Sequence, residues 1–505
     1  MVNLCLTLAE SSAVVLREKI SHYTGQVPYL EVRFDYLDAI EIPKVFNHQG
    51  TQFIATCRPE REGGNYKGTE VDRIDLLQKA AHSGFHWLDL EHDVTSIKNL
   101  PSTTQVIRSY HCFGDSCANL ENYFQTLKNA GGDVLKLAIS IRTTKELIEL
   151  LEWMPSIPKE IPFVILGMGI FGQVSRLLGG FLGNRWTYVA EKIENSVAPG
   201  QFTLKQAQDW YRLSGWESPP PIFGVLGNPV EHSLSPLIHN RLFKHFGVTN
   251  IYLPFLIDHI DLWLRYVRTS PLDFRGFSVT LPFKTDALKL VETNTSPVNS
   301  INTLTRKGSS WEGSNTDYAA FLYPLQSRFS LEGKTALILG NGGVAHTVVR
   351  ALQNEGLSVT VAGRNCEKVS KFASRYGCSW TSLSNLPTKV DFCINTTPVG
   401  QHPNTDESLL QARDMKFDVV YDLIYRPEKT LLLRSANQLG LQTISGMEMF
   451  VEQAARQFQD WTGLSPDREM IKDIINEALC LSVALGPPPF LGLVRLDRLK
   501  GVALR

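Results

Sequence analysis

Apolar residues in the first 205 positions fall into short β-rich runs, separated by stretches in which apolar positions have helical spacing. Helical spacing of this kind is clear in Val71–Ala81 and Leu120–Ala130, so the pattern is a repeated βα unit. Eight such repeats predict an α/β fold that begins with a (β/α)8 barrel. The eight expected strands are Asn3–Ala9, Tyr29–Phe34, Gln52–Cys57, His86–Glu91, Gln105–Tyr110, Asp133–Ile139, Pro162–Gly167 and Trp186–Ala190.

The pattern changes near Trp210–Pro221, where the run Trp216-Glu217-Ser218-Pro219-Pro220-Pro221 breaks both the helical and the strand periodicity. We interpret this segment as an interdomain linker. The chain of 505 residues is too long for one hydrophobic core, and a barrel of about 200 to 250 residues leaves room for a second enzyme-sized unit.

Ionisable side chains recur at the carboxyl ends of the expected strands, where (β/α)8 barrels place their active sites. Each has an ordinary structural alternative: Glu91 as a solvated strand end, Arg58 as an ion-pair partner, His111 as a core histidine. Their recurrence at successive strand ends favours an active site. The residues concerned are Glu31, Arg33, Arg58, Glu91, His111 and Lys136.

Lys136 lies inside the apolar run Val134–Ile139. Burial lowers the pKa of a lysine, and a neutral amine condenses with a ketone to form a Schiff base. The alternative is a side chain whose stem packs in the core while its ammonium group reaches solvent. The company of the other ionisable groups favours imine chemistry.

His111 suits the next chemical step, because a base beside an imine can take the neighbouring proton and return it to a departing hydroxyl. The expected reaction is therefore a dehydration. Glu91 is expected to orient His111 and tune its charge. Arg33, Arg58 and Arg176 supply the planar donors that a substrate carboxylate and hydroxyls require.

The second half contains a glycine-rich turn between an apolar strand and a helix start, in Thr335–Ala345. Gly340 would make the turn, Gly342 and the adjacent Gly343 would let the backbone approach a pyrophosphate, and small Ala345 would allow close helix–strand packing. The pattern predicts a dinucleotide site in a Rossmann fold.

The choice of dinucleotide depends on the end of the next apolar strand, Leu357–Ala362, which is followed by Gly363-Arg364. NAD-binding proteins usually place an acidic residue there, whereas a guanidinium suits the extra phosphate of NADP. We therefore expect NADP(H), with Arg364 as the main contact and Asn365 and Lys368 as helpers. An exposed arginine without a ligand is the alternative.

Other polar loops surround this predicted site. Ser233 and Ser235 suit a hydroxylated ligand, and Lys284 with Asp317 is a candidate acid/base pair that holds a hydroxyl while hydride leaves its carbon. Thr396 lies in a polar loop after a buried strand, where a Rossmann sheet would present groups to the nicotinamide; an ordinary turn is the alternative.

Five motifs in the first 205 residues resemble those of type I 3-dehydroquinate dehydratase: Glu31-Val32-Arg33-Phe34-Asp35, Ser109-Tyr110-His111, Lys136-Leu137-Ala138, Ser175-Arg176 and Ala198-Pro199-Gly200-Gln201. The resemblance implies Lys136 as the Schiff-base residue and His111 as general acid/base, with Glu91 as its partner. The substrate contacts that it implies are Glu31, Arg33, Arg58, Arg176 and Gln201.

One position departs from that family pattern. Relatives often have Ser or Thr before the Ala-Pro-Gly-Gln run, where this chain has Val197. Ser196 lies one residue before that position, so the resemblance does not assign a donor for one minor hydrogen bond to the substrate.

Residues 222 to 482 resemble shikimate dehydrogenase in the order and spacing of their motifs. This resemblance implies Lys284 and Asp317 as the catalytic pair, and Tyr425 and Gly446 as residues lining the cleft between nicotinamide and substrate. The shikimate ligands that it implies are Ser233, Ser235, Thr280, Asn302 and Gln453.

Both resemblances together divide the chain into parts. The parts are a barrel at 1–208, a linker at 209–221, a substrate-binding lobe at 222–328, a Rossmann NADP-binding lobe at 329–424, C-terminal helices at 425–485 that return to the substrate lobe, and a tail of unknown role at 486–505. Consecutive reactions follow as the expected function: 3-dehydroquinate loses water to give 3-dehydroshikimate, which NADPH reduces to shikimate. The alternatives are a reductase that acts on quinate, or one half that binds ligand without turnover.

The composition is that of a metabolic enzyme. A net charge of −1 provides no electrostatic footprint for nucleic acid or an acidic membrane. Eight cysteines without a CxxC pair favour reduced thiols in a cytoplasmic enzyme, and the twelve histidines show no metal-site spacing. The chain enters an expected strand almost at once and has no membrane-length apolar run, so neither a signal peptide nor a membrane helix is expected.

Overall fold

The computed structural model describes residues 2–45, 50–94, 97–114, 119–230, 233–387 and 389–484. The described chain forms two compact units, one extending to Arg275 and the other comprising Gly276–Leu479. The predicted tail at 486–505 lies outside the described residues. Within the described part, no helix combines the length and apolar character needed to cross a membrane.

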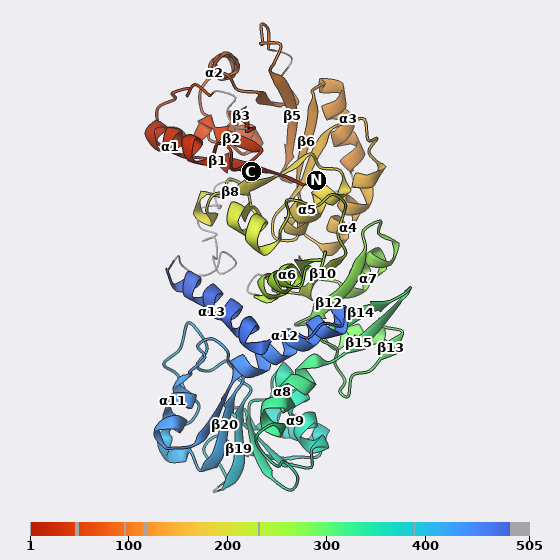
Figure 1. Cartoon of the computed structure of the whole chain (residues 1–505), viewed down its shortest axis with the longest axis vertical. Helices are drawn as coiled ribbons and strands as arrows, with labels where there is room; N and C mark the ends of the chain where they lie inside the picture. Colours follow the sequence, from red (N-terminus) through yellow and green to blue (C-terminus); the bar gives the residue numbers. More distant parts are fainter. Residues whose placement is uncertain are drawn as a thin grey trace. The chain divides into compact units, whose positions relative to one another are not determined.

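Every strand expected for the barrel is present in the first unit (Figure 1). Consecutive strands pair in parallel with their neighbours, from β7 back to β1 and on to β8, and a short ninth strand, β9 (Phe202–Thr203), follows β8. The strands are β1 (Asn3–Leu8), β2 (Tyr29–Arg33), β3 (Gln52–Thr56), β4 (Trp87–Glu91), β5 (Gln105–Cys112), β6 (Val134–Ser140), β7 (Phe163–Met168) and β8 (Trp186–Ala190).

Closure between β7 and β8 differs from the other strand contacts, because it lacks a continuous ladder among the described strands. The backbone of Arg185 donates to the Phe163 carbonyl at 2.9 Å. The side chain of Asn184 then acts as a substitute peptide group for Ile165, accepting from its N–H at 2.7 Å and donating to its carbonyl at 2.8 Å. The sheet thus curls into the predicted barrel, and this seam is joined by one backbone hydrogen bond and the side chain of Asn184.

The helices cover the outside of the curled sheet, and Figure 1 shows α3 and α4 alongside β5 and β6. Threonine hydroxyls begin two of them: Thr69 accepts from Asp72 N before α2, and Thr143 accepts from Glu146 N before α4. The helices of the barrel are α1 (Ala13–Tyr23), α2 (Glu70–His82), α3 (Leu120–Ala130), α4 (Thr144–Trp153) and α5 (Gln173–Leu178).

After the barrel, a π-helix at Gln206–Trp210 leads into the predicted linker. Tyr211 and Leu213 are fully buried, so the start of this segment packs into the first unit and is not a free tether. The strands β10 (Ile222–Gly227) and β11 (Ile251–Leu256) then pair in parallel. The helices that follow them are α6 (Ser235–His245) and α7 (Ile260–Thr269).

The second unit begins within β12 (Phe274–Val279) and continues into an antiparallel pair formed by β14 (Thr303–Lys307) and β15 (Ser310–Ser314). A two-residue strand, β13 (Thr293–Asn294), joins the edge at β15. Helix α8 (Thr316–Gln326) connects this region to a second sheet.

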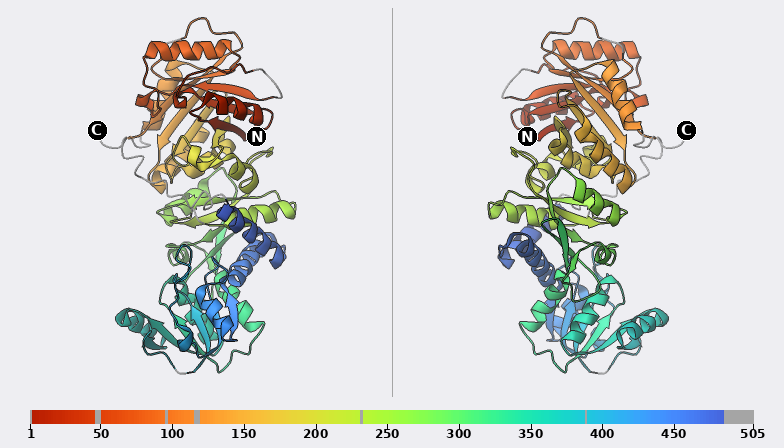
Figure 2. Two further views of the ribbon diagram at one scale, coloured as in Figure 1. Left: turned by 90° about the vertical axis from the view of Figure 1, so that its left-hand side faces the viewer. Right: turned by 90° about the vertical axis from the view of Figure 1, so that its right-hand side faces the viewer.

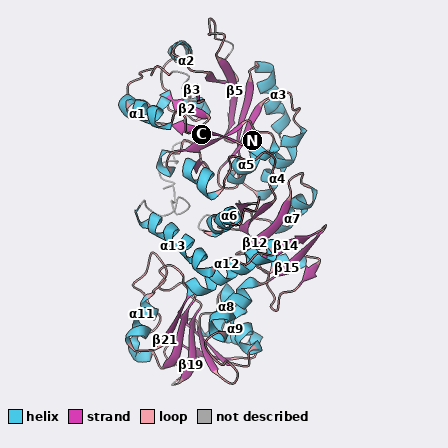
Figure 3. Cartoon of the chain, viewed as in Figure 1, coloured by secondary structure: helices cyan, strands magenta, loops and turns pink. Residues whose placement is uncertain are grey.

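That second sheet is parallel, and its order β18-β17-β16-β19-β20-β21 is the 3-2-1-4-5-6 order of dinucleotide-binding folds. Its two faces carry separate cores, with α8, α9 and α10 packed on one face and α11 on the other. Figure 3 shows α8 and α9 on one side of this sheet and α11 on the other. The elements are β16 (Thr335–Leu339), α9 (Gly343–Asn354), β17 (Ser358–Gly363), α10 (Cys366–Tyr376), β18 (Ser379–Ser382), β19 (Val390–Asn395), β20 (Phe417–Asp422), α11 (Leu431–Gln438) and β21 (Gln442–Ser445).

Two long helices complete the fold, α12 (Gly446–Thr462) and α13 (Arg468–Ala484). Helix α12 packs along α8 (Figure 2). The start of α12 is set by a capping box, in which Ser445 and Glu448 satisfy each other's backbone amides.

Candidate active sites

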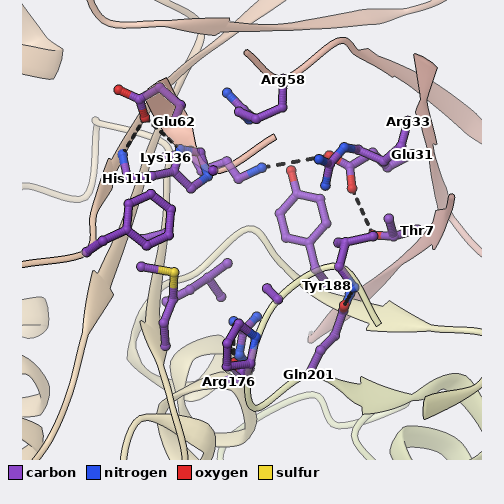
Figure 4. Close-up of a pocket in the computed structure, with 18 residues that line it drawn as sticks. Thr7, Glu31, Arg33, Arg58, Glu62, His111, Lys136, Arg176, Tyr188 and Gln201 are labelled. Atoms are coloured by element: carbon purple, nitrogen blue, oxygen red, sulfur yellow. Dashed lines mark hydrogen bonds and ion pairs between the residues drawn. The ribbon is translucent and has the colours of Figure 1, made fainter. Parts of the chain in front are cut away.

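A pocket at the carboxyl ends of the barrel strands gathers seven of the eight ionisable or polar residues that the sequence predicts for the barrel (Figure 4). They come from separate strands and loops, and the parallel sheet brings them to one rim. Glu91 is the exception and does not line the pocket. The seven residues are Glu31, Arg33, Arg58, His111, Lys136, Arg176 and Gln201.

Lys136 is buried on β6, with 5% of its surface exposed. Its Nζ donates to Oδ2 of Asp89 at 2.7 Å and lies 3.8 Å from Oε1 of Glu31. The ring centroid of Tyr188 is 4.2 Å from the same nitrogen. The amine is therefore held inside the pocket, and the alternative of a head group that extends into solvent is wrong.

The carboxylate of Asp89 is fully buried. Burial alone would raise its pKa, but the adjacent charges of Arg58 and Lys136 outweigh burial and hold the pKa of Asp89 well below its ordinary value. Asp89 is thus a permanent anion that fixes the position of the amine.

His111 is oriented by Glu62 and not by Glu91. Oε2 of Glu62 lies 3.0 Å from Nδ1 of His111 and accepts from its backbone N–H at 2.8 Å. Glu91 instead binds two arginines, Arg58 Nη1 at 2.7 Å and Arg73 Nη1 at 2.7 Å. The predicted pairing was wrong because the Glu91 carboxylate is bound by Arg58 and Arg73. Glu62, in the segment after β3, contacts the histidine instead.

The His111–Glu62 pair is electrostatically unusual. Burial, reinforced by the positive charges of Arg58 and Lys136, lowers the pKa of His111 well below its ordinary value. Burial raises the pKa of Glu62 to about 7 against the opposing charge of Arg58. The imidazole is therefore neutral at physiological pH and can act as a base.

Arg176 on α5 is a buried guanidinium with little compensation. Its Nε has no hydrogen-bond partner within the described chain, and its Nη2 reaches the Pro199 carbonyl only at 3.5 Å. Burial lowers the pKa of Arg176 to about 10. Such a cation is suited to an incoming anion.

The other two arginines of the pocket already have carboxylate partners. Arg33 makes two hydrogen bonds to Asp35, at 2.9 and 2.8 Å. Arg58 Nη2 lies 2.7 Å from Asp89 in addition to its contact with Glu91. Among the three arginines of this pocket, Arg176 therefore has the greatest capacity left for a substrate carboxylate.

Hydroxyl and amide groups fix the remaining pocket residues. Glu31 accepts from Thr7 at 2.8 Å and from Thr56 at 2.9 Å. Oε1 of Gln201 accepts from the backbone N–H of Val197 at 3.2 Å, and Ser196 donates to the same atom at 3.3 Å. Val197 itself lines the pocket, whereas the Ser196 hydroxyl serves its own loop.

In the second unit, the predicted acid/base pair is in direct contact. Nζ of Lys284 donates to Oδ2 of Asp317 at 2.6 Å. Asp317 stands in the first turn of α8, whose N-terminus favours a carboxylate, and the side chain of Asn315 caps that helix. Lys284 keeps 31% of its side chain exposed and Asp317 keeps 14%, so a ligand can reach the pair.

The predicted substrate ligands have varied surroundings. Asn302 is buried, donates to Thr316 Oγ1 at 2.9 Å and accepts from Thr316 N at 2.7 Å. Thr280 and Gln453 are half-buried, and Tyr425 stacks on Phe450 with 4.5 Å between ring centroids. Ser233 and Ser235 belong to the first unit, where Ser233 Oγ accepts from Ser235 N at 3.3 Å.

The glycine turn has the geometry that a pyrophosphate requires. Gly340 adopts φ +105°, and a Cβ there would lie 2.6 Å from Thr397 Cγ2. Gly342 precedes the first turn of α9, and no atom lies within 4 Å of the place where its Cβ would be. This open surface at a helix N-terminus, followed by Gly343 and the fully buried Ala345, fits a dinucleotide phosphate.

Thr396 supports the same turn from β19. Its hydroxyl donates to the Leu339 carbonyl at 2.8 Å and its backbone N–H donates there at 2.9 Å. These bonds fasten the loop after β19 to the end of β16, directly before Gly340.

Three other predicted cofactor residues have distinct situations. Arg364 is exposed and has no ion pair within the described chain. Asn365 caps α10 by accepting from Lys368 N at 3.0 Å, which commits its side-chain oxygen. Gly446 is required by packing, because a Cβ there would lie 2.3 Å from the Leu423 carbonyl oxygen.

Four side chains of the barrel that contact the predicted site residues were not anticipated from the sequence: Glu62, Arg73, Asp89 and Tyr188. Asp89 and Glu91 are two residues apart on β4, so their side chains lie on the same face of the strand. This spacing was a signal in the sequence that Asp89 belongs to the same group of charges as Glu91. The groups of three or more metal-ligating side chains that a metal centre needs are not found in the described residues.

Four family models match successive parts of the chain. The model for "Type I 3-dehydroquinase" matches residues 4–218, "Shikimate dehydrogenase substrate binding domain" matches 225–304, "Shikimate / quinate 5-dehydrogenase" matches 325–414, and "Shikimate 5'-dehydrogenase C-terminal domain" matches 446–474. The order of these matches follows the order of the predicted domains.

Similar proteins include a bifunctional 3-dehydroquinate dehydratase/shikimate dehydrogenase, chloroplastic, of Arabidopsis thaliana, 29% identical over 92% of this chain and 82% of that protein. The shikimate dehydrogenase (NADP(+)) of Nostoc is 35% identical over 52% of this chain and 97% of that protein. The crystal structure of a shikimate dehydrogenase in complex with NADP+ covers 51% of this chain and 95% of its own, with 30% identity and a TM-score of 0.47. The chain therefore belongs to the shikimate dehydrogenase family and carries, in the same polypeptide, a type I 3-dehydroquinase domain.

Proposed function

We propose that this chain catalyses two consecutive reactions of the shikimate pathway. The barrel removes water from 3-dehydroquinate through a Schiff base, and the second half reduces the resulting 3-dehydroshikimate to shikimate with NADPH. The observation that carries the first step is the buried amine of Lys136, which is held by Asp89 at 2.7 Å in a pocket shared with a neutral His111.

In the dehydration, the Lys136 ammonium releases a proton and its Nζ attacks the substrate ketone. The ketone oxygen takes up the two protons lost from the nitrogen and leaves as water, so that the protonated imine remains. His111 removes the proton from the neighbouring carbon, because its imidazole is neutral and Glu62 holds its Nδ1 side. The same imidazole then protonates the leaving hydroxyl. Hydrolysis of the imine releases 3-dehydroshikimate and restores the lysine.

The substrate is oriented by its anionic and hydroxyl groups. Arg176 is the proposed carboxylate ligand, because its guanidinium is buried and nearly unpaired. Glu31, Arg33, Arg58 and Gln201 line the same pocket and are the proposed contacts for the ring hydroxyls.

In the reduction, NADPH supplies the hydride that reaches the carbonyl carbon. Lys284 donates a hydrogen bond and a proton to the carbonyl oxygen, and Asp317 holds that ammonium at 2.6 Å. Gly340, Gly342 and the N-terminus of α9 are the proposed pyrophosphate site, with Arg364 as the ligand for the additional phosphate of NADP. The proposed shikimate ligands are Ser233, Ser235, Thr280, Asn302, Tyr425 and Gln453.

The decisive test follows NADPH absorbance after 3-dehydroquinate is added to the purified chain, with 3-dehydroshikimate as a parallel substrate. Oxidation with both substrates means that both sites work in sequence. In Lys136→Ala, oxidation should persist only with 3-dehydroshikimate, whereas in Lys284→Ala dehydration should persist while oxidation stops. Absence of oxidation with either substrate in the wild type contradicts the proposal.

A second substrate deserves the same assay, because one of the matching family models covers quinate as well as shikimate dehydrogenases. Oxidation of quinate by NADP+ at a rate above that of shikimate would reassign the reductase half. If one half of the chain binds its ligand without turnover, binding of that ligand should be measurable while the corresponding reaction rate is zero.

We also propose a cytoplasmic location. Its support is that Cys5, Cys57, Cys366, Cys378 and Cys393 are free thiols, as expected in a reducing compartment. Fractionation of the source cells with an antibody to the chain tests this proposal.

A further inference from the structure

Tyr188 stands inside the dehydratase pocket without a role in the reaction derived above. It lies on β8, with 4% of its surface exposed, and contributes to the pocket lining (Figure 4). Two separate features of this side chain, its ring face and its hydroxyl, point to work on the reacting groups.

The ring face of Tyr188 contacts the reacting nitrogen, since Lys136 Nζ lies 4.2 Å from the ring centroid. A cation above an aromatic face is attracted by the quadrupole of the ring, most strongly where water is excluded. An ammonium group has three N–H donors, but the protonated imine made from it has one, which Asp89 accepts at the present Nζ position. The ring face needs no N–H donor, so its attraction for the cation persists after the imine has formed.

The hydroxyl of Tyr188 is buried and has no hydrogen-bond partner within the described chain. Burial, and then the negative charge of Glu31, raise the pKa of Tyr188 well above its ordinary value, so the hydroxyl keeps its proton. An unmatched buried donor is unfavourable, and a ligand oxygen within reach removes that cost. The substrate of the proposed dehydration is a ring with several hydroxyl and carboxylate oxygens.

We propose that Tyr188 is a further functional residue of the dehydratase, whose ring face stabilises the cationic nitrogen of Lys136 through imine formation and whose hydroxyl donates to an oxygen of the bound substrate. This inference rests on the Schiff-base dehydration proposed above. The sequence motifs had assigned the chemistry to Lys136 and His111. The proposal adds a residue of β8 to these two.

Two substitutions separate the two features. Tyr188→Phe keeps the ring and removes the hydroxyl, whereas Tyr188→Leu removes both. Tyr211→Phe is the matched control, because the Tyr211 hydroxyl is also fully buried and without a partner in the described residues but lies outside the pocket. Thermal unfolding of each preparation reports whether the barrel has folded, and reduction of 3-dehydroshikimate reports whether the reductase half has folded.

For Tyr188→Phe we expect the KM for 3-dehydroquinate to rise about 2- to 13-fold, the effect of one lost hydrogen bond, with kcat and imine trapping by borohydride near wild type. For Tyr188→Leu we expect kcat to fall a further 3- to 30-fold or so, with a smaller trapped fraction. A purely structural role would not divide KM and kcat between these two variants.

Unchanged dehydration kinetics in Tyr188→Phe, relative to Tyr211→Phe, would overturn the role of the hydroxyl. Equal kcat and equal trapping in the Leu and Phe variants would overturn the role of the ring. Wild-type protein that is not inactivated by borohydride in the presence of substrate would instead overturn the Schiff-base reaction itself, so the two failures are distinguishable.

Discussion

The ammonium of Lys136 and the carboxylate of Asp89 form a buried ion pair with 2.7 Å between Nζ and Oδ2. Asp89 is fully buried and also binds Arg58 at 2.7 Å, so it links the reacting amine to a guanidinium of the pocket. A buried pair of this kind contributes more to the position of the amine than to net stability.

Asp89→Asn should impair both dehydration and the stability of the barrel, because it removes one partner of this buried pair and leaves the other. We expect kcat/KM for 3-dehydroquinate to fall about 100-fold or more, because the amine loses its fixed partner. Unfolding should be easier by about 3 to 5 kcal/mol, since Lys136 and Arg58 are left undercompensated. Dehydration rates and thermal unfolding check these values, and a variant with the wild-type dehydration rate would show that Asp89 is dispensable.

Paired substitutions can test that Glu62, and not Glu91, is the partner of His111. Glu62→Gln should lower kcat for dehydration by about 10- to 100-fold, because the base loses its orienting carboxylate. Glu91→Gln should act chiefly on thermal stability, since it weakens the contacts with Arg58 and Arg73. Should Glu91→Gln lower kcat more than Glu62→Gln without loss of stability, Glu91 would regain the orienting role.

The raised pKa of Glu62 predicts a pH dependence of stability. Its pKa is about 7 in the fold against an ordinary value of 4.5, so the folded state binds this proton more tightly than the unfolded state. Its contribution to stability is complete below pH 4.5 and is lost as the pH rises through 7, by up to about 3 kcal/mol. Between pH 5 and pH 8, urea unfolding should show a smaller loss of stability in Glu62→Gln than in wild type, because buried Asp422, whose pKa is raised to about 6, still contributes in the variant.

Arg176→Met should separate binding from stability. Removal of the guanidinium should raise the KM for 3-dehydroquinate by about 100-fold, the effect of one charge-assisted contact, while the melting temperature stays level or rises because an unpaired buried charge is gone. Arg33→Met is the contrasting control, since it leaves Asp35 buried without its partner and should lower the melting temperature. A drop in melting temperature for Arg176→Met would mean that its guanidinium is compensated within the fold.

Arg364→Ser should reduce the preference for NADPH. The guanidinium is exposed and uncommitted, so its loss should raise the KM for NADPH by about 10- to 100-fold and leave that for NADH nearly unchanged. Asn365→Ala is a useful comparison, because it removes the cap of α10 and should act on stability more than on cofactor choice. Equal effects of Arg364→Ser on both cofactors would contradict phosphate recognition at this position.

Much of the architecture was readable from local pattern. The eight barrel strands, the helix Leu120–Ala130 and the glycine turn after Leu339 are confirmed, because each depends on periodicity or on backbone needs within a few residues. Lys136 and His111 were also predicted as pocket residues, because the strand ends of a parallel barrel meet at one rim. The contact between Lys284 and Asp317 was also expected from their motifs.

The amino-acid sequence by itself determined which elements form and which strand ends carry chemistry, because these depend on alternation, capping and turn residues along the chain. Only the tertiary structure decided that Glu62 contacts His111, that Asp89 contacts Lys136 and that Asn184 closes the barrel seam. Asp89 and Glu91 share one strand face, and no local pattern ranks two acids of equal burial. Their partners are chosen by where the loop after β3 and the arginines Arg58 and Arg73 extend, which is a property of packing between distant segments.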